Sequence, residues 1–400
     1  MPLANSSRSN QRYAKEATFG SVTAGTGRRK IRNTGSSFKY GLSFDRSKEI
    51  RSDRQVADHI LLGATANGGM NFELVYKEYE EFLAATLQSN FTLIGTSGVT
   101  ATLTSPTFTA NTLTQTGGDT FANLRPGQWI QISGCTGATL ANNRVIQVSL
   151  TVAATATVIT FEGSPALVTG VATGTVVVRA GRVENGIIQP SFSIEPEYND
   201  VTQFQTFRGM TLSKASLNFA SRSIATGSFD FLGVDAMPLS GTSNLNGTDS
   251  VSYPTTHDVL NCTSNVASIL EANAALAAGT YVKSLTLDID NSLQGQDAIQ
   301  NLGVVGIRAN QLKVSGKMMV YFADGTLYSK FVNNTASSVS VQVRDASLNG
   351  YVFNLPAIEY TDASLQVGSL DQDVMVEMSF DAKIDTVTGK MIAIDRFGVI

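Results

Sequence analysis

Histidine, cysteine and charge are all scarce in this chain: charged residues make up 16% of its 400 positions. Its two histidines, His59 and His257, have no Ser, Cys or metal-ligand partner at motif spacing, so surface or capping roles are expected for both. Its two cysteines, Cys135 and Cys262, cannot build a disulfide framework. Both are expected to be free thiols, which fits synthesis in a reducing cytosol.

Long apolar runs and strongly basic stretches are also missing. No run approaches the roughly 20 apolar residues that cross a bilayer, and the first residues lack the apolar core of a signal peptide. The net charge is −4, and the single basic cluster (Arg28, Arg29, Lys30 and Arg32) has no interleaved aromatics. No glycine-rich loop opens a helix with Lys-Ser or Lys-Thr. The sequence therefore predicts neither membrane insertion nor a nucleotide or nucleic-acid site.

Pairs of carboxylates are the remaining candidates for chemistry. Asp288 and Asp290, followed by Asn291, lack the glycine and the closing glutamate of a calcium loop, and a polar strand end is expected. Two further pairs have no recognisable catalytic partner, and spacing alone does not make a glycosidase. These pairs are Glu195/Glu197 and Glu80/Glu81. We predict no catalytic, cofactor-binding or metal-binding residue, and an enzyme is not expected.

What the chain does contain is strand-like alternation, clearest in residues 189–234. Phe192 and Ile194 alternate with serines, and Phe229 and Phe231 flank Asp230. This period of two is typical of a half-buried antiparallel sheet. It predicts strands over 191–195, 210–220 and 224–232, with a hairpin turn at 221–223.

A similar pattern returns about ninety residues later, over 283–325. Residues 284–288 match 191–195, a polar loop follows in each, and each copy is expected to end in a hairpin. Helix-like runs at 74–88 and 266–278 precede the two copies. A helix, a strand, a loop and a hairpin that occur twice suggest a duplicated module. In the second copy five residues join helix to strand, whereas the first copy has about a hundred, so 95–180 is expected to be an inserted small domain.

The remaining segments complete a mainly β fold class with short flanking helices. The insertion is rich in Thr, Val and Ile and predicts a compact β-sandwich or small barrel, with Trp129 as its core anchor and Pro126-Gly127 as a turn. A strand over 38–44, a loop or short helix over 47–62 and a turn at Gly68-Gly69 are also expected. The expected divisions are a flexible arm (1–37), a first module (38–94 and 181–240), the inserted outward-facing domain (95–180) and a second module (257–400).

Several of these segments together resemble the major tail tube protein of long-tailed bacteriophages. They are SKEIRSDRQVADHI, MNFELVYKEYEEFLAATLQ, PSFSIEPEYND with its hairpin, YVKSLTLDIDNSL, and VVGIRANQLKVSGKMMVYFADGTLY. The resemblance covers most of 38–94 and 181–397, and rests on pattern and segment order. The Thr-rich insertion is similar to the immunoglobulin-like decorations on the outer surface of such proteins.

The resemblance implies a structural virion protein, made in the host cytoplasm, whose modules close into rings that merge into a barrel. Rings would stack through 46–69 and the basic arm, and bind tail-end proteins. The lumen would hold a tape-measure protein and pass DNA without binding it, which favours an acidic or neutral wall; its lining residues are not predicted. Two modules per chain favour a trimeric ring with pseudo-sixfold symmetry, with a hexameric ring as the alternative. A baseplate or shell protein and a β-rich adhesion module remain alternative functions.

Overall fold

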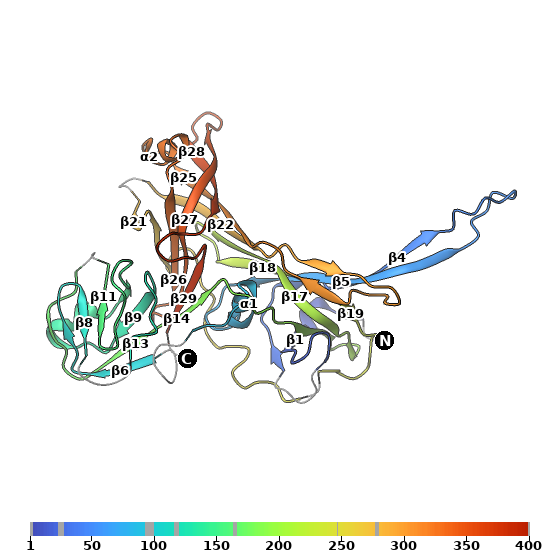
Figure 1. Ribbon diagram of the computed structural model, residues 1–400, viewed down its shortest axis with the longest axis horizontal. Coiled ribbons are helices and arrows are strands. Elements are labelled where there is room, and N and C mark those ends of the chain that lie inside the picture. Colours follow the sequence, from blue (N-terminus) through green and yellow to red (C-terminus); the bar gives the residue numbers. More distant parts are fainter. Residues whose placement is uncertain are drawn as a thin grey trace.

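The computed structural model describes residues 3–22, 28–92, 100–115, 120–162, 166–245, 247–276 and 280–398. The fold is mainly β, built from antiparallel sheets with few short helices. Two units with the same strand connectivity lie side by side, and a group of smaller sheets forms a separate body beside the second unit (Figure 1). The sequence prediction of a mainly β fold with short helices is confirmed.

The first unit is a sandwich in which each strand pairs with the next in the order β4-β5-β18-β17-β15-β1. Its elements are β1 (Ser9–Lys15), β4 (Lys39–Arg46), β5 (His59–Glu73), α1 (Glu80–Thr86), β15 (Phe192–Tyr198), β17 (Phe207–Ala220) and β18 (Thr226–Gly233). Tyr13, Phe72, Phe82, Phe192 and Phe229 fill its centre, all at most 1% exposed. Phe72 stacks on Phe229 with ring centroids 4.5 Å apart.

The second unit repeats that order as β22-β25-β28-β27-β26-β20. Its elements are β20 (Val266–Glu271), β22 (Val282–Asp290), β25 (Lys313–Tyr321), α2 (Thr326–Val332), β26 (Ser337–Arg344), β27 (Gly350–Gln366) and β28 (Met375–Ala382). The elements also follow one another along the chain in the same sequence as in the first unit. Strand order, chain order and helix position all agree, which is the signature of a duplicated unit.

Irregularities of the two sheets fall at equivalent places. The register of β17 against β18 shifts between Leu212 and Lys214, and that of β27 against β28 shifts between Tyr360 and Asp362. A glycine lies at the equivalent position on the other side of β18 and β28: Gly68 of β5 is opposite Phe231, and Gly316 of β25 is opposite Phe380. A Cβ on Gly68 would lie 2.5 Å from the Phe38 Cα, and one on Gly316 2.5 Å from the Thr286 carbonyl oxygen. Close strand approach therefore excludes a side chain at both positions.

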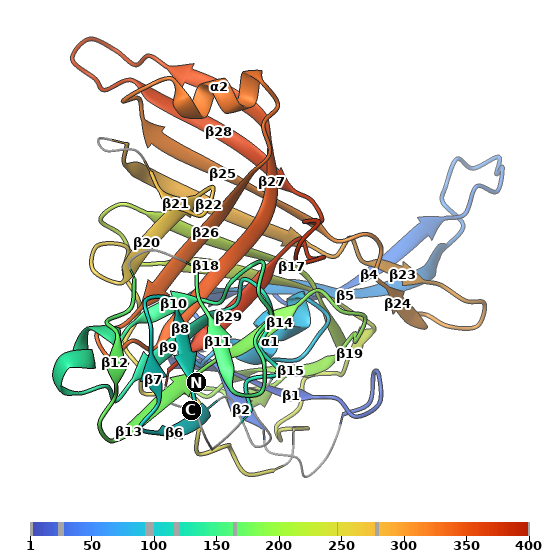
Figure 2. The ribbon, with the colours of Figure 1, turned by 60° about the vertical axis from the view of Figure 1, so that its left-hand side comes forward.

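One strand pair joins the units into a single sheet. β17 pairs with β22 from Lys214 opposite Asp290 to Ala220 opposite Ser284. The result is a continuous eight-stranded sheet in the order β4-β5-β18-β17-β22-β25-β28-β27 (Figure 2). Short elements complete the two units. They are η1 (Ser6–Arg8), β2 (Arg29–Lys30), β3 (Gly35–Ser36), β14 (Gly181–Glu184), β16 (Gln203–Phe204), β19 (Asp235–Ala236), β21 (Ala274–Ala275), β23 (Gln294–Gln296), β24 (Gly306–Arg308) and β29 (Ala393–Phe397).

The segment between α1 and β14 forms two small four-stranded sheets, β10-β9-β13-β6 and β11-β8-β7-β12. Its elements are β6 (Thr100–Thr104), β7 (Thr107–Phe108), β8 (Thr112–Thr114), β9 (Trp129–Ser133), η2 (Gly137–Asn142), β10 (Val145–Gln147), β11 (Val158–Thr160), β12 (Gly170–Val171) and β13 (Thr175–Arg179). It has a hydrophobic cluster of its own, with members from Ala101 to Ala180. The predicted turn at Pro126-Gly127 is present, with Gly127 at a φ of +69°.

Two predicted helices differ from the structure. The run 266–278 is not a helix: it forms β20 and β21, because Ala272 and Asn273 adopt positive φ values (53° and 57°) and turn the chain into a hairpin. The first run shortens to α1, and the Lys77 backbone (φ 69°) breaks any helix before it. The residues of its apolar stripe are nevertheless all buried: Tyr76, Tyr79, Phe82, Leu83 and Leu87.

Other sequence expectations were also wrong. Gly68 and Gly69 do not turn the chain but lie inside β5, and the expected hairpin of the second copy is the single strand β25. Trp129 is only partly buried and lies outside the cluster of the inserted sheets, at the edge that meets the second unit. The expectation of a flexible arm is wrong for Ser9–Lys15, which forms β1 and pairs along its whole length with β15.

Candidate assembly surface

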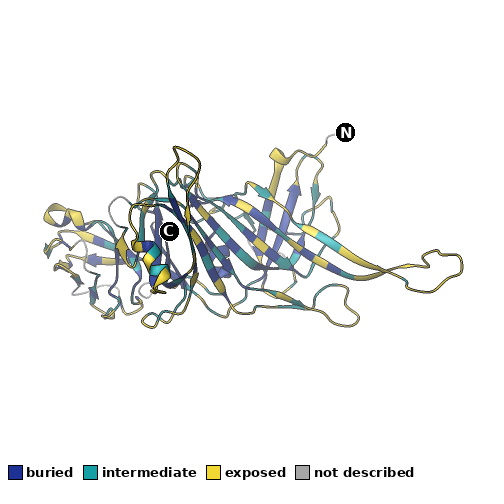
Figure 3. Ribbon diagram, turned by 90° about the horizontal axis from the view of Figure 1, so that it is seen from above, coloured by how far each residue is buried: buried dark blue, intermediate teal, exposed yellow. Residues whose placement is uncertain are grey.

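The eight-stranded sheet has one face against the hydrophobic core and one open face. Buried and exposed residues alternate along its strands, as Figure 3 shows in the view from above. On β22, for example, Leu285, Leu287 and Ile289 are buried, whereas the residues between them are not. Backbone alternation thus places a row of polar side chains along each strand of the open face.

Acidic residues outnumber lysines at the alternating open-face positions of these strands. The carboxylates are Glu73, Asp230, Asp288, Asp290, Glu359, Asp362, Glu377 and Asp381, and the lysines are Lys39, Lys214, Lys313 and Lys317. Some are paired across strands: Lys214 lies 3.2 Å from Asp288, and Lys317 lies 3.7 Å from Glu377. The open face is therefore polar with an acidic excess.

The two ends of the eight-stranded sheet are edges without a partner strand in the described part of the chain. At one end, β4 pairs with β5 alone. At the other, residues 358–366 of β27 pair with β28 on one side. Edge strands of this kind present unpaired N–H and C=O groups that another chain can pair with.

A long β4–β5 hairpin projects from the body of the molecule (Figure 1). Its apolar side chains are exposed: Leu42, Phe44, Ile50, Val56, Ile60, Leu61 and Leu62. The shorter β23–β24 hairpin occupies the equivalent place in the second unit and also exposes apolar residues, Ile299 being 94% exposed. The two hairpins touch, since the Ala64 N–H donates to the Leu302 carbonyl oxygen at 2.8 Å. Exposed apolar clusters of this kind are typical of protein–protein contacts.

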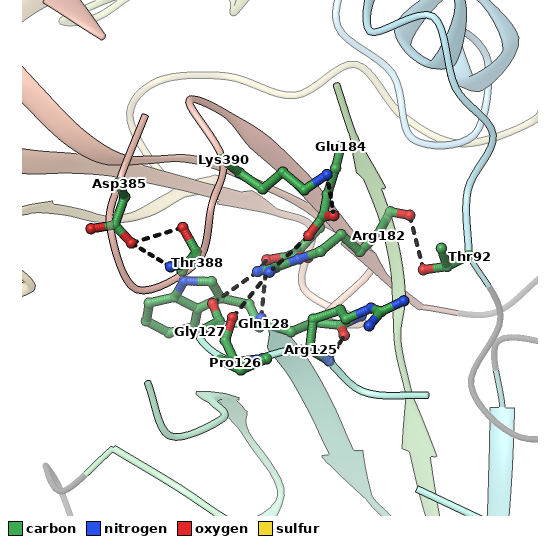
Figure 4. Close-up of polar contacts among 12 residues, drawn as sticks. Thr92, Arg125, Pro126, Gly127, Gln128, Arg182, Glu184, Asp385, Thr388 and Lys390 are labelled. Carbon is green, nitrogen blue, oxygen red and sulfur yellow. Dashed lines mark hydrogen bonds and ion pairs between the residues drawn. The ribbon is translucent and has the colours of Figure 1, made fainter. Parts of the chain in front are cut away.

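A buried ion pair connects the inserted sheets to the second unit (Figure 4). Arg182 of β14 donates to both carboxylate oxygens of Asp395 in β29, at 2.6 and 2.8 Å, and also to the Gly127 carbonyl oxygen at 2.9 Å. Asp395 in turn accepts from the Trp129 backbone N–H at 3.0 Å. Burial raises the pKa of Asp395, and the Arg182 guanidinium opposes that shift. The buried pair therefore links β14, β29 and the segment that contains Gly127 and Trp129.

The predicted candidate residues for chemistry are held apart. His59 is exposed at the start of β5, and His257 packs its ring edge-on against Tyr76, with centroids 5.1 Å apart. Asp288 pairs with Lys214, while Asp290 accepts from the Ser292 backbone N–H at 2.6 Å. Among the described residues, no group of three or more His, Cys, Asp or Glu could hold a metal ion.

The acidic pairs have partners that sequence inspection did not find. Glu195 is fully buried and accepts from the Thr206 hydroxyl (2.6 Å) and the Asn244 backbone N–H (2.9 Å). Glu80 is paired with Arg396, and burial raises its pKa. Glu197 pairs with Arg12 and Glu81 with Arg29. These contacts join distant segments of the chain, which is a structural role.

The basic cluster is folded onto its own chain. Arg28 lies 2.8 Å from Asp249, Arg29 sits over the Tyr253 ring, and Arg32 donates to the His257 carbonyl oxygen at 2.7 Å. Both cysteines are free, and burial raises the pKa of Cys135 to about 11. Within the described ranges, no helix has the length and apolar character needed to cross a membrane.

The model of one protein family matches residues 6–382 of this chain; that family is described as phage tail tube protein. The chain belongs to the phage tail tube protein family. The match spans both units and the inserted sheets, and membership implies a structural component of the virion tail that assembles with itself. The family points to a protein without enzymatic activity. No curated protein matches the chain.

Sequence inspection missed Arg182 and Asp395. The available signal was weak: Asp395 lies between Ile394 and Arg396 in β29, and Arg182 lies between Gly181 and Val183 in β14. Their pairing depends on the contact between β14 and β29, more than two hundred residues apart in the chain. The lining of the open face, which the sequence left unassigned, follows directly once the strand pairing is known.

Proposed function

We propose that this tail tube protein polymerises as stacked rings into the hollow tube of the phage tail, with three chains in each ring. The observation that carries the proposal is the eight-stranded sheet. Within it β17 of the first unit pairs with β22 of the second, and the strands equivalent to these two, β27 and β4, lie free at its two ends. Head-to-tail repetition of such an interface closes into a ring when the rotation allows it. Three chains supply six units, whereas a hexameric ring would need twelve.

The open polar face lines the lumen in this proposal. The other face of the sheet carries the core and cannot contact water or DNA. An acidic wall repels phosphates and so lets DNA pass without stalling. The same lumen houses the tape-measure protein during assembly.

The projecting hairpins supply the contacts between rings. Their apolar side chains lie at one end of the molecule, on the part of the β4–β5 hairpin that extends beyond residues 35–41 and on the β23–β24 hairpin. The inserted body at 95–180 packs beside the second unit on the opposite side from the hairpins (Figure 1). We propose that it is a domain on the outer surface of the tube, and that 38–94 with 181–240, and 257–400, are the two tube modules.

Negative-stain electron microscopy of the purified protein at high concentration tests this proposal. Hollow filaments of uniform diameter are the expected result, and a variant with residues 47–58 replaced by a short Gly/Ser turn should give rings that do not stack. Monomers that form neither rings nor tubes, even with tail-end proteins present, would contradict it. Closed rings without tubes would favour a baseplate protein, and monomers that bind a host surface would favour an adhesin.

A further inference from the structure

The junction between the two units of one chain predicts how two chains meet. We propose that β27 of one copy pairs with residues 35–41 of the next copy in the register that β17 and β22 adopt within the chain. This inference rests on the proposed ring. It places Asp362 opposite Gly41, Ser364 opposite Lys39, Gln366 opposite Ser37 and Gly368 opposite Gly35.

The register follows from superposing the two units through their pairings. The strand shifts align Lys214 with Asp362, since each is the first paired residue after the irregularity. On the other side, Gly68 aligns with Gly316 through their partners Phe231 and Phe380.

The pairings of β5 with β4 and of β25 with β22 then align the two strands on the other side of the junction. Asn67 aligns with Ser315, so their partners Lys39 and Asp288 are equivalent. Tyr40 and Ile289 follow as the next equivalent pair, and Ser36 aligns with Leu285. The intrachain pairs from Lys214/Asp290 to Ala220/Ser284 can therefore be transferred residue by residue to the free edges.

Burial distinguishes the occupied junction from the free edge. At the intrachain junction Leu217 and Phe219 are 2% and 4% exposed. Their equivalents on β27, Leu365 and Val367, are 44% and 76% exposed. These two apolar side chains lack the cover that β22 gives to their counterparts. A neighbouring copy at residues 35–41, which carries Phe38 at the place of Leu287, would supply that cover.

Charge gives an independent argument, because the positions of the acidic and the basic residue of the junction's ion pair are reversed on the two free edges. Within the chain Lys214 on β17 lies 3.2 Å from Asp288 on β22. The equivalents on the free edges are Asp362 and Lys39, so acid and base have changed sides. In the described part of the chain neither forms an ion pair, and both are exposed. The two free edges are thus complementary to each other.

Cysteine cross-linking in assembled protein tests the register. Ser37→Cys with Gln366→Cys should give covalent dimers and trimers on mild oxidation, because opposed strand residues lie within disulfide range. The pair Ser37→Cys with Leu365→Cys is slipped by one residue and points to the other face, so it should stay monomeric. Asn218→Cys with Thr286→Cys is the matched intrachain control. Native thiol background is low, since burial raises the pKa of both Cys135 and Cys262.

Charge reversal tests the exchanged pair. Lys39→Asp or Asp362→Lys alone should raise the concentration needed for assembly about three- to tenfold, because it sets like charges across each seam. The double variant, which copies the arrangement of Lys214 and Asp288, should recover most of the loss.

The outcomes separate this inference from the proposed function. Tubes in which Ser37→Cys/Gln366→Cys cross-links no faster than the slipped pair would overturn the register and leave the tube function intact. Cross-linked trimers that never form tubes would support the seam and contradict the tube. Reversal variants that assemble as the wild type, singly and together, would remove the role of the charge pair.

Discussion

The two units of this chain have the same strand order but different cores. Equivalent positions hold Phe229 and Met378, and Phe72 and Val320, so at these two places the first unit has an aromatic ring where the second has a flexible or branched aliphatic side chain. Both units nevertheless retain the strand irregularity and the glycine beside it. The comparison teaches that alternation and backbone irregularity are common to the two units, whereas the individual core residues can vary.

The units also differ in what joins helix to strand. In the second unit residues 333–336 connect α2 to β26, whereas in the first unit residues 87–191 connect α1 to β15. The shared strand order survives this difference because both ends of the long segment lie together at the sheet. An extra body can therefore be carried at this joint without changing the strands that form the eight-stranded sheet.

The largest expected effect comes from a charge placed in either core. Phe229→Asp and Met378→Asp should each prevent folding of their unit, because both side chains are fully buried and an unpaired carboxylate there costs several kcal/mol. Soluble yield and circular dichroism measure the result. The matched control Asp230→Asn changes an exposed neighbour and should fold normally. A soluble Phe229→Asp chain that still assembles would contradict the assigned strand face.

A smaller effect is expected where the inserted body meets the second unit. Arg182→Ala should lower the free energy of unfolding by about 3–5 kcal/mol, because it leaves Asp395 buried without its cation. Arg182→Met with Asp395→Leu should lose less, since no charge remains buried. Chemical denaturation of the single and double variants measures the coupling. Additive losses would show that the pair does not act as a unit.

The smallest effect on assembly is expected from removing the inserted body itself. A chain in which a short Gly/Ser linker replaces residues 95–180 should still form tubes, because the second unit folds without such an insertion. Electron microscopy and tube diameter give the readout, and a narrower outer profile is expected. If the shortened chain folds but no longer forms tubes, the inserted body takes part in the wall.

Sequence patterns predicted the strands better than their partners. Alternation located β17 and β18, because one face of each is buried in a continuous core, and it also located β15, although both faces of that strand are buried. The duplication was also inferred, but with the wrong correspondences: the run 266–278 was matched to α1, while the equivalent helix is α2. Apolar residues in that run satisfy helical spacing as well as strand spacing, and only the pairing of β20 with β26 selects between them.

Contacts between distant segments were beyond sequence inspection. Trp129 was expected in the core of the inserted sheets because it is large and apolar, yet β9 begins at this residue and its backbone N–H donates to Asp395 of the second unit. The open face and its acidic excess likewise depend on which strands are neighbours. The exchanged pair of Lys39 and Asp362 becomes visible only when the two units are aligned through their hydrogen-bonded registers.

A helical reconstruction of the assembled tube by cryo-electron microscopy tests the central claim most directly. The account predicts threefold rings whose inner wall is one continuous barrel, with β27 of each chain beside β4 of the next and the carboxylates of the open face toward the lumen. A ring of six whole chains, or a wall in which the eight-stranded sheet turns its open face outward, would contradict it.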